Sequence, residues 1–355
     1  MQPCEGESRA GGLLELGAQV YTRLTMAFPG SSGDRSLQPM APSSRPPGFQ
    51  SEDSSPASSR PYHYRLVDVF TDRRFSGNPL AVFTDARGLN TELMQRIARE
   101  LNHAETTFVF PPFDRAHDYS VRIFSPHAEL PTSAHPSIGT AFALAQERAI
   151  AAPMSPNRLV FDEASGPVSV SMVSPITTTK QELPRFGAEY PETHTAAAVL
   201  SLSLEDLLPG LPVQAVASSV AYLLIPVNGL EALKRIRLRL DIWERTIRRF
   251  EAPHIFAFTL ESEKSASTAT TRMFAPALGI SEAPATESAC GPLAAYLVRY
   301  HLVPMRREHL FVFEQGAEIG RPSLIHVSAE QEADLLTQLR IGGQCVVVGE
   351  GTIFI

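Results

Sequence analysis

The chain has 355 residues, of which 43% are hydrophobic and 19% charged, and its formal net charge is −7. This composition is ordinary for a globular protein of one large or two smaller domains, and no apolar run is long enough to predict a membrane span. The acidic balance argues against a broad nucleic-acid interface, which needs a clustered basic face. Three scattered cysteines argue against a disulfide framework and favour a reducing, cytoplasmic location.

Residues 1–60 are dense in serine, proline and glycine and lack the apolar periodicity of a buried core, so we expect them to be disordered. The first half then predicts, in order, strands 62–70 and 80–84, a helix over 90–102, strands 106–110 and 119–124, a loop and Ala-rich helix within 125–146, and a hairpin over 158–173 closing near Gly166. Asn90 can cap the first of these helices.

The second half repeats this order of elements. It predicts strand 218–227, a helix over 233–250, strands 254–260 and 271–276, a loop and helix from Ala283, and strands 309–316, 323–328 and 339–355. Apolar residues recur every three or four positions in 233–250, with arginines between them. We interpret this segment as an amphipathic helix with a solvated basic face rather than a nucleic-acid site.

The two halves can be aligned residue by residue as an internal repeat. VRIFSP at 121–126 matches TRMFAP at 271–276, and HPSIGTAFAL from His135 pairs with APATESACGP from Ala283, which sets Gly139 opposite Glu287. The repeat predicts two similar lobes, 61–190 and 191–342, with the last strand, 343–355, able to return to the first lobe. Two helix N-termini would then face one cleft, where their unpaired N–H groups suit a carboxylate or a developing enolate.

Several motifs, in the same order along the chain, resemble the phenazine-biosynthesis-like (PhzF-like) isomerase/epimerase family. They are VDVFTDRRFSGNPLAVF, IARELNHAETTFVFPP, YSVRIFSPHAELPTSAHPSIGTA, FEQGAEIGRPSLI and the closing IGGQCVVVGEGTI. The resemblance covers nearly everything from Tyr62 to the C-terminus. It implies the α+β diaminopimelate-epimerase-like fold, with two pseudo-symmetric lobes, each a curled and mostly antiparallel sheet around a central helix. It also implies a homodimer and a small-molecule substrate without a cofactor.

The resemblance implies a set of site residues. Glu105, in the ETTFV motif, matches the family's proton-transferring glutamate, and the end of a helix is a place from which a loop can present it to a cleft. His135 matches a histidine that orients substrate or assists proton transfer, and Ala134 before it replaces a glycine. Ser288 keeps a hydroxyl donor of the family. Expected substrate contacts complete the set: Asn78, Ala134, Thr286, Glu287 and Gly291.

The second helix start departs from the family pattern, Asp-Pro-Ala-Thr-Gly-Ser-Ala. Ala283 replaces the aspartate, although Glu282 is adjacent, and Glu287 replaces the glycine. A carboxylate about 4 Å from a substrate carboxylate would cost on the order of 4 kcal/mol at an effective dielectric constant of 20. Either the substrate differs from the family's usual type, or Glu287 is protonated, or it turns away. As an alternative without function, Glu287 complements the helix dipole.

Three functions remain open on the sequence. The first is a cofactor-free isomerase in which Glu105 moves a proton between substrate carbons. The second is an epimerase, racemase or cyclase in which Glu105 works with a second acid such as Glu287. The third is a non-catalytic ligand-binding homologue. A racemase with two thiols is disfavoured because Cys290 has no partner cysteine in the first lobe, and a metal site is disfavoured because the histidines are dispersed.

Overall fold

The computed structural model describes residues 60–151, 157–333 and 335–355. The segment predicted to be disordered, 1–60, lies outside the described residues except for Arg60. Residues from Pro56 to Ile355 form one compact unit. Within its described part, no helix is long and apolar enough to cross a membrane.

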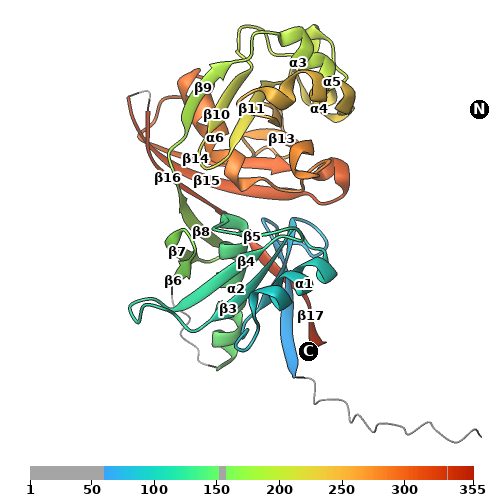
Figure 1. Ribbon diagram of the computed structural model, residues 1–355. Helices are drawn as coiled ribbons and strands as arrows, with labels where there is room; N and C mark the ends of the chain where they lie inside the picture. Colours follow the sequence, from blue (N-terminus) through green and yellow to red (C-terminus); the bar gives the residue numbers. More distant parts are fainter. Residues whose placement is uncertain (1–59, 152–156, 334) are drawn as a thin grey trace, which may run out of the picture. The chain divides into compact units, whose positions relative to one another are not determined.

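The first half of the described chain consists of short strands and two main helices (Figure 1). Its elements are β1 (Pro61–Val69), β2 (Asn78–Phe83), α1 (Thr91–Leu101), β3 (Glu105–Phe110), β4 (Tyr119–Phe124), β5 (Glu129–Leu130), α2 (Ala134–Ala151), β6 (Arg158–Glu163), β7 (Gly166–Val173), β8 (Ile176–Gln181) and β9 (Arg185–Glu189). The helix predicted from the Asn90 cap is confirmed: the Asn90 side chain accepts the Leu93 N–H at 2.9 Å.

The second half follows a similar order, with additional short helices. Its elements are α3 (Thr193–Val199), η1 (Leu204–Asp206), β10 (Gln214–Ala217), β11 (Ala221–Pro226), α4 (Leu230–Arg235), α5 (Leu240–Arg245), η2 (Ile247–Arg249), β12 (His254–Thr259), β13 (Ala269–Phe274), η3 (Pro276–Leu278), α6 (Glu287–Arg299), β14 (Glu308–Gln315), η4 (Ala317–Ile319), β15 (Ser323–Glu332), β16 (Leu335–Gly343) and β17 (Cys345–Phe354).

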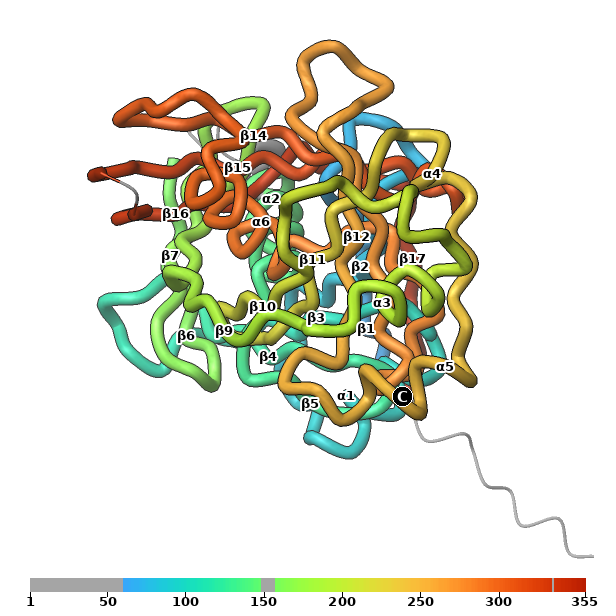
Figure 2. The backbone as a smooth tube through the Cα atoms, turned by 90° about the horizontal axis from the view of Figure 1, so that it is seen from above, coloured from blue at the N-terminus to red at the C-terminus, as the bar shows by residue number. Residues whose placement is uncertain are grey.

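Strand pairing repeats between the halves. In the first, β1–β2 is antiparallel, β2–β3 parallel, β3–β4 antiparallel, β4–β6 parallel, and β6–β7–β8 antiparallel. The second half has the same pattern in β10–β11, β11–β12, β12–β13, β13–β14 and β14–β15–β16. The antiparallel pair β8–β16 joins the two halves. Buried side chains of α2 and α6 belong to one hydrophobic core. The two helices overlap near the middle of Figure 2, which looks down from the top of Figure 1, where α6 lies above α2.

Two strands cross from one half to the other. β17 pairs with β1 along nine residue pairs, so the red C-terminal strand lies beside the blue first strand in Figure 1. In the same way β9, the last strand before residue 190, pairs with β10 of the second half. These pairings support a first lobe that receives the C-terminal strand. They also favour assigning β9 to the second lobe, although the predicted boundary at 190 places it in the first. The lobe boundaries 61–190 and 191–342 therefore remain a proposal.

The single helix predicted over 233–250 is wrong. The chain instead forms α4, α5 and η2, separated by an extended residue at Ile236 (φ −50°, ψ 131°). Arg272 explains the interruption. Its buried guanidinium donates to the carbonyls of Leu233, in α4, and of Ile236, just beyond the end of α4, so these carbonyls are satisfied without a continuing helix. Four of the six apolar residues that defined the pattern are buried: Leu233, Ile236, Trp243 and Ile247. The other two, Leu240 and Phe250, are exposed and partly buried, respectively.

The predicted alignment of the two central helices is also wrong in its register. α2 begins at Ala134 and α6 at Glu287, so the helix starts align Ala134 with Glu287 and His135 with Ser288, not Gly139 with Glu287. The reason is the length of the connection that precedes each helix. The second connection contains η3 and is longer than the first, which shifts the sequence match by several residues.

Candidate active site

Glu105 and His135 form a hydrogen-bonded pair at the start of α2. Glu105 is the first residue of β3, and its side chain is 19% exposed, whereas that of His135 is 1% exposed. The His135 Nδ1 lies 2.8 Å from Glu105 Oε2. The contact occupies one carboxylate oxygen of Glu105 and leaves Oε1 available, because no described residue binds it. The pair therefore combines a fixed carboxylate with a partly open face.

The hydrogen bonds of His135 fit the doubly protonated ring. Its Nδ1 faces Glu105 Oε2, and its Nε2 lies 3.2 Å from the backbone carbonyl of Asn78, which can only accept. Burial disfavours the imidazolium, but the hydrogen bond and charge of Glu105, with the charge of Glu287, outweigh it and raise the pKa of His135 above its usual value. The site thus favours a buried imidazolium held between carboxyl groups.

Asn78 and Ala134 border this pair. The Asn78 Nδ2 is 3.4 Å from the His135 Nδ1, a contact that becomes a hydrogen bond only when Nδ1 carries no proton. Its Oδ1 is buried and makes no hydrogen bond with any described residue. A buried amide oxygen without a partner is costly, so this atom is suited to accept from a bound ligand. Ala134, the first residue of α2, is partly exposed beside it.

Glu287 reaches across from the second half to the start of α2. Its Oε1 accepts the backbone N–H of His135 at 3.1 Å, so the side chain points into the site and does not turn away. Glu287 is 7% exposed. Burial raises its pKa, and the nearby charge of Glu105 adds to this effect, whereas the charge of His135 opposes it. Of the three explanations for this unusual residue, the structure excludes the one in which the side chain turns away, and the raised pKa is the direction that the protonated form requires.

Ser288 lies at the start of α6 but contacts a different set of residues. Its Oγ is 2.7 Å from the Tyr222 hydroxyl, and its carbonyl accepts from Gln181 Nε2 at 3.1 Å. Burial raises the pKa of Tyr222, which keeps this hydroxyl protonated. Gly291 is buried one turn further on, where a Cβ atom would approach within 2.1 Å of Gln181 Oε1. Gly291 therefore permits close packing of Gln181 rather than lying beside Glu105.

Thr286 is held in place by a glutamine from β14. Gln315 Nε2 donates to the Thr286 hydroxyl at 2.9 Å and to the Ala283 carbonyl at 2.8 Å. The adjacent acid, Glu282, does not replace the missing aspartate, because both of its carboxylate oxygens accept from Arg272, at 2.9 and 2.7 Å. Glu287 is thus the acidic side chain that this segment brings to the site.

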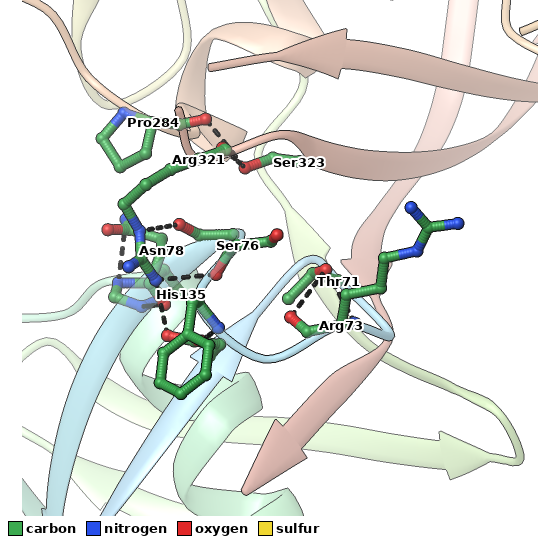
Figure 3. Close-up of polar contacts among 11 residues, drawn as sticks. Thr71, Arg73, Ser76, Asn78, His135, Pro284, Arg321 and Ser323 are labelled. Carbon is green, nitrogen blue, oxygen red and sulfur yellow. Dashed lines mark hydrogen bonds and ion pairs between the residues drawn. The ribbon is translucent and has the colours of Figure 1, made fainter. Parts of the chain in front are cut away.

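Arg321, in the GRPS part of a family motif, joins the halves beside the site (Figure 3). Its guanidinium donates to Asp68 Oδ1 at 2.6 Å, to the Ser76 carbonyl at 2.7 Å and to the Gly77 carbonyl at 2.8 Å. Asp68 in turn accepts the Phe75 N–H. These bonds fix the loop that leads into Asn78. The sequence did not single out Arg321, Tyr222, Gln181 or Gln315, and only the family motif that contains Gln315 and Arg321 carried a signal.

A cavity of about 250 Å³ adjoins this network and is lined by both halves. Arg73 and Ser76 come from the first half, and Lys264, Gln315 and Ser323 from the second. Ser76 is two residues from Asn78, and Gln315 binds Thr286, so the cavity lies next to the predicted substrate contacts. Its charged lining mixes two cations, Arg73 and Lys264, with four acids, so charge alone does not select an anionic ligand; the acids are Asp72, Glu263, Glu314 and Glu318. Cys290 is buried, and burial raises its thiol pKa.

The facing helix starts, the repeated pairing and the acid–histidine pair define the diaminopimelate-epimerase-like class of α+β protein expected from the sequence. Residues 67–351 match the family described as phenazine biosynthesis-like protein, and the chain belongs to that family. The crystal structure of the Bacillus anthracis phenazine biosynthesis protein of the PhzF family is similar, with a TM-score of 0.76 and 25% identity over 83% of this chain and 100% of that one. The predicted family and fold are both confirmed.

Two curated relatives are isomerases by name. Trans-2,3-dihydro-3-hydroxyanthranilate isomerase of Pseudomonas chlororaphis is 33% identical over 297 residues, which cover 82% of this chain and 99% of the relative. An uncharacterised isomerase of Mesorhizobium japonicum is 36% identical over 310 residues, again covering 82% of this chain and 99% of the relative.

Proposed function

We propose that the chain, an isomerase by its family membership, acts without a cofactor on a small organic acid, and that Glu105 is its general acid and base. The single observation that carries this proposal is the 2.8 Å contact between Glu105 Oε2 and His135 Nδ1, which orients a partly exposed carboxylate. Such a positioned group typically contributes about 10²–10⁴-fold to the rate of a proton transfer.

In the proposed reaction, the free Oε1 of Glu105 takes a proton from a substrate carbon next to an activating group. The electron pair of the broken C–H bond moves into the substrate as an enolate or dienolate. N–H groups at the starts of α2 and α6, together with the His135 imidazolium, stabilise this negative charge. Glu105, now protonated, returns the proton to a different carbon. The product is an isomer of the substrate, with no net change in protons or electrons.

The name of the Pseudomonas chlororaphis relative provides a first substrate to test, trans-2,3-dihydro-3-hydroxyanthranilate. Two stable aromatic analogues serve as binding probes: 3-hydroxyanthranilate, which has its hydroxyl, amino and carboxylate groups, and anthranilate, which lacks the hydroxyl. Because Glu287 stands where the family pattern has glycine, we expect the preferred substrate to differ in size or charge from that of the relative.

A second reaction, epimerisation, is favoured by one specific observation. Glu105 and Glu287 contact the same residue, His135, one at its ring and the other at its backbone N–H. Two acids near one substrate carbon would allow one to remove a proton and the other to deliver a proton to the opposite face. Deuterium from D₂O distinguishes the two reactions, because epimerisation returns the label to the carbon that lost its proton, whereas a proton shift labels a different carbon.

The Glu105→Gln variant tests the proposal. We expect its turnover of the dihydro compound to fall by about 10³-fold, because the amide cannot accept the proton, while calorimetry shows 3-hydroxyanthranilate bound within about threefold of wild type. Glu100→Gln, an exposed substitution on α1, is the matched control and should leave turnover unchanged. Wild-type turnover by the Glu105 variant would contradict the role of this residue.

A further inference from the structure

His254 occupies the position in the second half that Glu105 occupies in the first. Phe124 and Phe274 are equivalent in the aligned motifs VRIF and TRMF. In β4, Phe124 lies opposite the second residue of β3, and in β13, Phe274 lies opposite the second residue of β12. The first residues of these two strands are Glu105 and His254. Strand register therefore makes His254 the counterpart of Glu105.

Each of the two residues also lies opposite a residue of a parallel neighbouring strand. Leu80 of β2 lies opposite Glu105, and Tyr222 of β11 lies opposite His254. The chemistry of the two pairs differs. An acid beside an aliphatic residue in the first half corresponds to a histidine beside a tyrosine in the second.

His254 faces the start of α6. Side chains alternate along a strand, so His254 shares a face of β12 with Phe256 and Phe258, which are in the hydrophobic core that includes α6. The ring of Tyr222 lies 6.1 Å from that of His254, and the Tyr222 hydroxyl is 2.7 Å from Ser288 Oγ at the helix start. His254, Tyr222 and Ser288 therefore line one polar edge of the second half.

The His254 side chain is polar, nearly buried and without a partner among the described residues. It is 9% exposed, and its Nδ1 is buried with no hydrogen bond. Burial lowers its pKa, so the ring is neutral near pH 7 and presents one N–H donor and one acceptor nitrogen. A buried side chain of this type is normally satisfied by a protein group, water or a ligand.

We propose that His254 contacts the substrate from the second half, across the site from Glu105, and recognises a hydroxyl group. This inference rests on the proposed function and names a specificity determinant for it. A hydroxyl can either donate to the buried Nδ1 or accept from it, so it fits both tautomers of the neutral ring, whereas a carboxylate can only accept. Glu105 would then act on the reacting carbon while His254 fixes the orientation of the ring or chain that carries the hydroxyl.

A thermodynamic cycle between protein and ligand tests the proposal without any need for turnover. Calorimetric dissociation constants are measured for 3-hydroxyanthranilate and anthranilate with the wild type and with His254→Phe. We expect the wild type to prefer the hydroxylated compound by about fivefold to tenfold, the effect of one or two net hydrogen bonds. The preference should disappear in His254→Phe, since phenylalanine keeps the ring and removes both nitrogens.

Two further variants make the result specific. His254→Gln retains a donor and an acceptor and should restore part of the preference. His326→Phe, at another histidine whose pKa is lowered by burial, is the matched control and should leave the preference unchanged.

An equal loss of both ligands in His254→Phe, or an unchanged preference, would overturn the proposal. So would a wild type that binds neither compound, because the ligand class would then be wrong. The turnover measurement on Glu105→Gln does not depend on these binding results, so the two proposals can fail separately.

Discussion

The start of α2 and the start of α6 occupy equivalent positions in the two halves but differ in charge. At the start of α2, the His135 ring and the Glu105 carboxylate are hydrogen-bonded to each other, so one group can donate a proton and the other can accept it. At α6, the equivalent positions hold His254 and Ser288, with the Tyr222 hydroxyl bound to the serine. In our two proposals the repeat retains one geometry and divides its use, with proton transfer in the first half and neutral recognition in the second.

The residues that anchor these two helix starts differ in the same way. Strand register makes Glu163, at the end of β6, equivalent to Gln315, at the end of β14. Glu163 accepts from the hydroxyls of Thr132 and Ser137, both at 2.5 Å, on either side of His135. Gln315 binds the segment before α6 through its amide. One anchor can ionise and the other cannot.

The largest expected effect comes from removing Arg321, which joins the two halves beside the site. In Arg321→Met, Asp68 keeps a carboxylate that is only 4% exposed but loses its cation. We expect the free energy of unfolding, measured in urea, to fall by about 4 kcal/mol, as for a buried ion pair that loses one partner. Arg87→Met removes the exposed ion pair with Asp85 and is the control, with no measurable change expected. Equal effects of the two substitutions would contradict this role of Arg321.

A smaller effect is expected when the first anchor is made like the second, in Glu163→Gln. Burial raises the pKa of Glu163 to about 7, although its two hydroxyl donors oppose the shift. Between pH 4.5 and 7 the folded protein therefore binds more protons at this carboxyl than the unfolded chain, so this group's contribution to stability falls as pH rises. Over that window the loss amounts to about 3 kcal/mol.

The Glu163→Gln variant should lack this dependence, so the stability difference between variant and wild type should grow from pH 4.5 to 7. Urea unfolding at several pH values measures it, with the exposed Glu100→Gln as control. A difference that does not change with pH would show that Glu163 does not titrate in this range.

The smallest effect concerns the residue that crosses between the helix starts. Since the pKa of Glu287 is raised by burial, the group ionises as pH increases beyond the usual carboxyl range, and its negative charge then repels a carboxylate ligand. We expect the affinity of Glu287→Gln for anthranilate to exceed that of wild type by a few fold, and this advantage to grow with pH in a calorimetric pH series. Anthranilamide, the neutral analogue, should show no such difference, and an equal change for both ligands would exclude a charge effect.

The sequence was sufficient for the elements that motifs and caps define. The helix starting after Asn90, both ends of β4 and the family all followed from local patterns, whereas β13 lies two residues before its predicted range of 271–276. The contact between Glu105 and His135 did not, since 30 residues separate them and only the parallel pairing of β2 with β3 brings them together.

Other features depended on tertiary contacts that a local pattern does not contain. The apolar spacing of 233–250 predicted one helix, yet Arg272, more than 20 residues away, binds the carbonyls at the end of α4 and favours an early stop. The same arginine pairs with Glu282, so this acid could not be excluded from the site until the pair was seen. The helix register failed because alignment by residue type cannot detect the extra turn, η3, before α6.

The exchange of β9 and β17 has a consequence for how this protein folds. A cut after residue 189 gives a first fragment that lacks the partner of β1 and a second that lacks the partner of β10. Each would present an unpaired edge strand, the usual starting point for aggregation. The edge of β1 is covered only when strands nearly 300 residues apart in the chain have met, so the two halves are expected to unfold in one cooperative transition and to refold slowly.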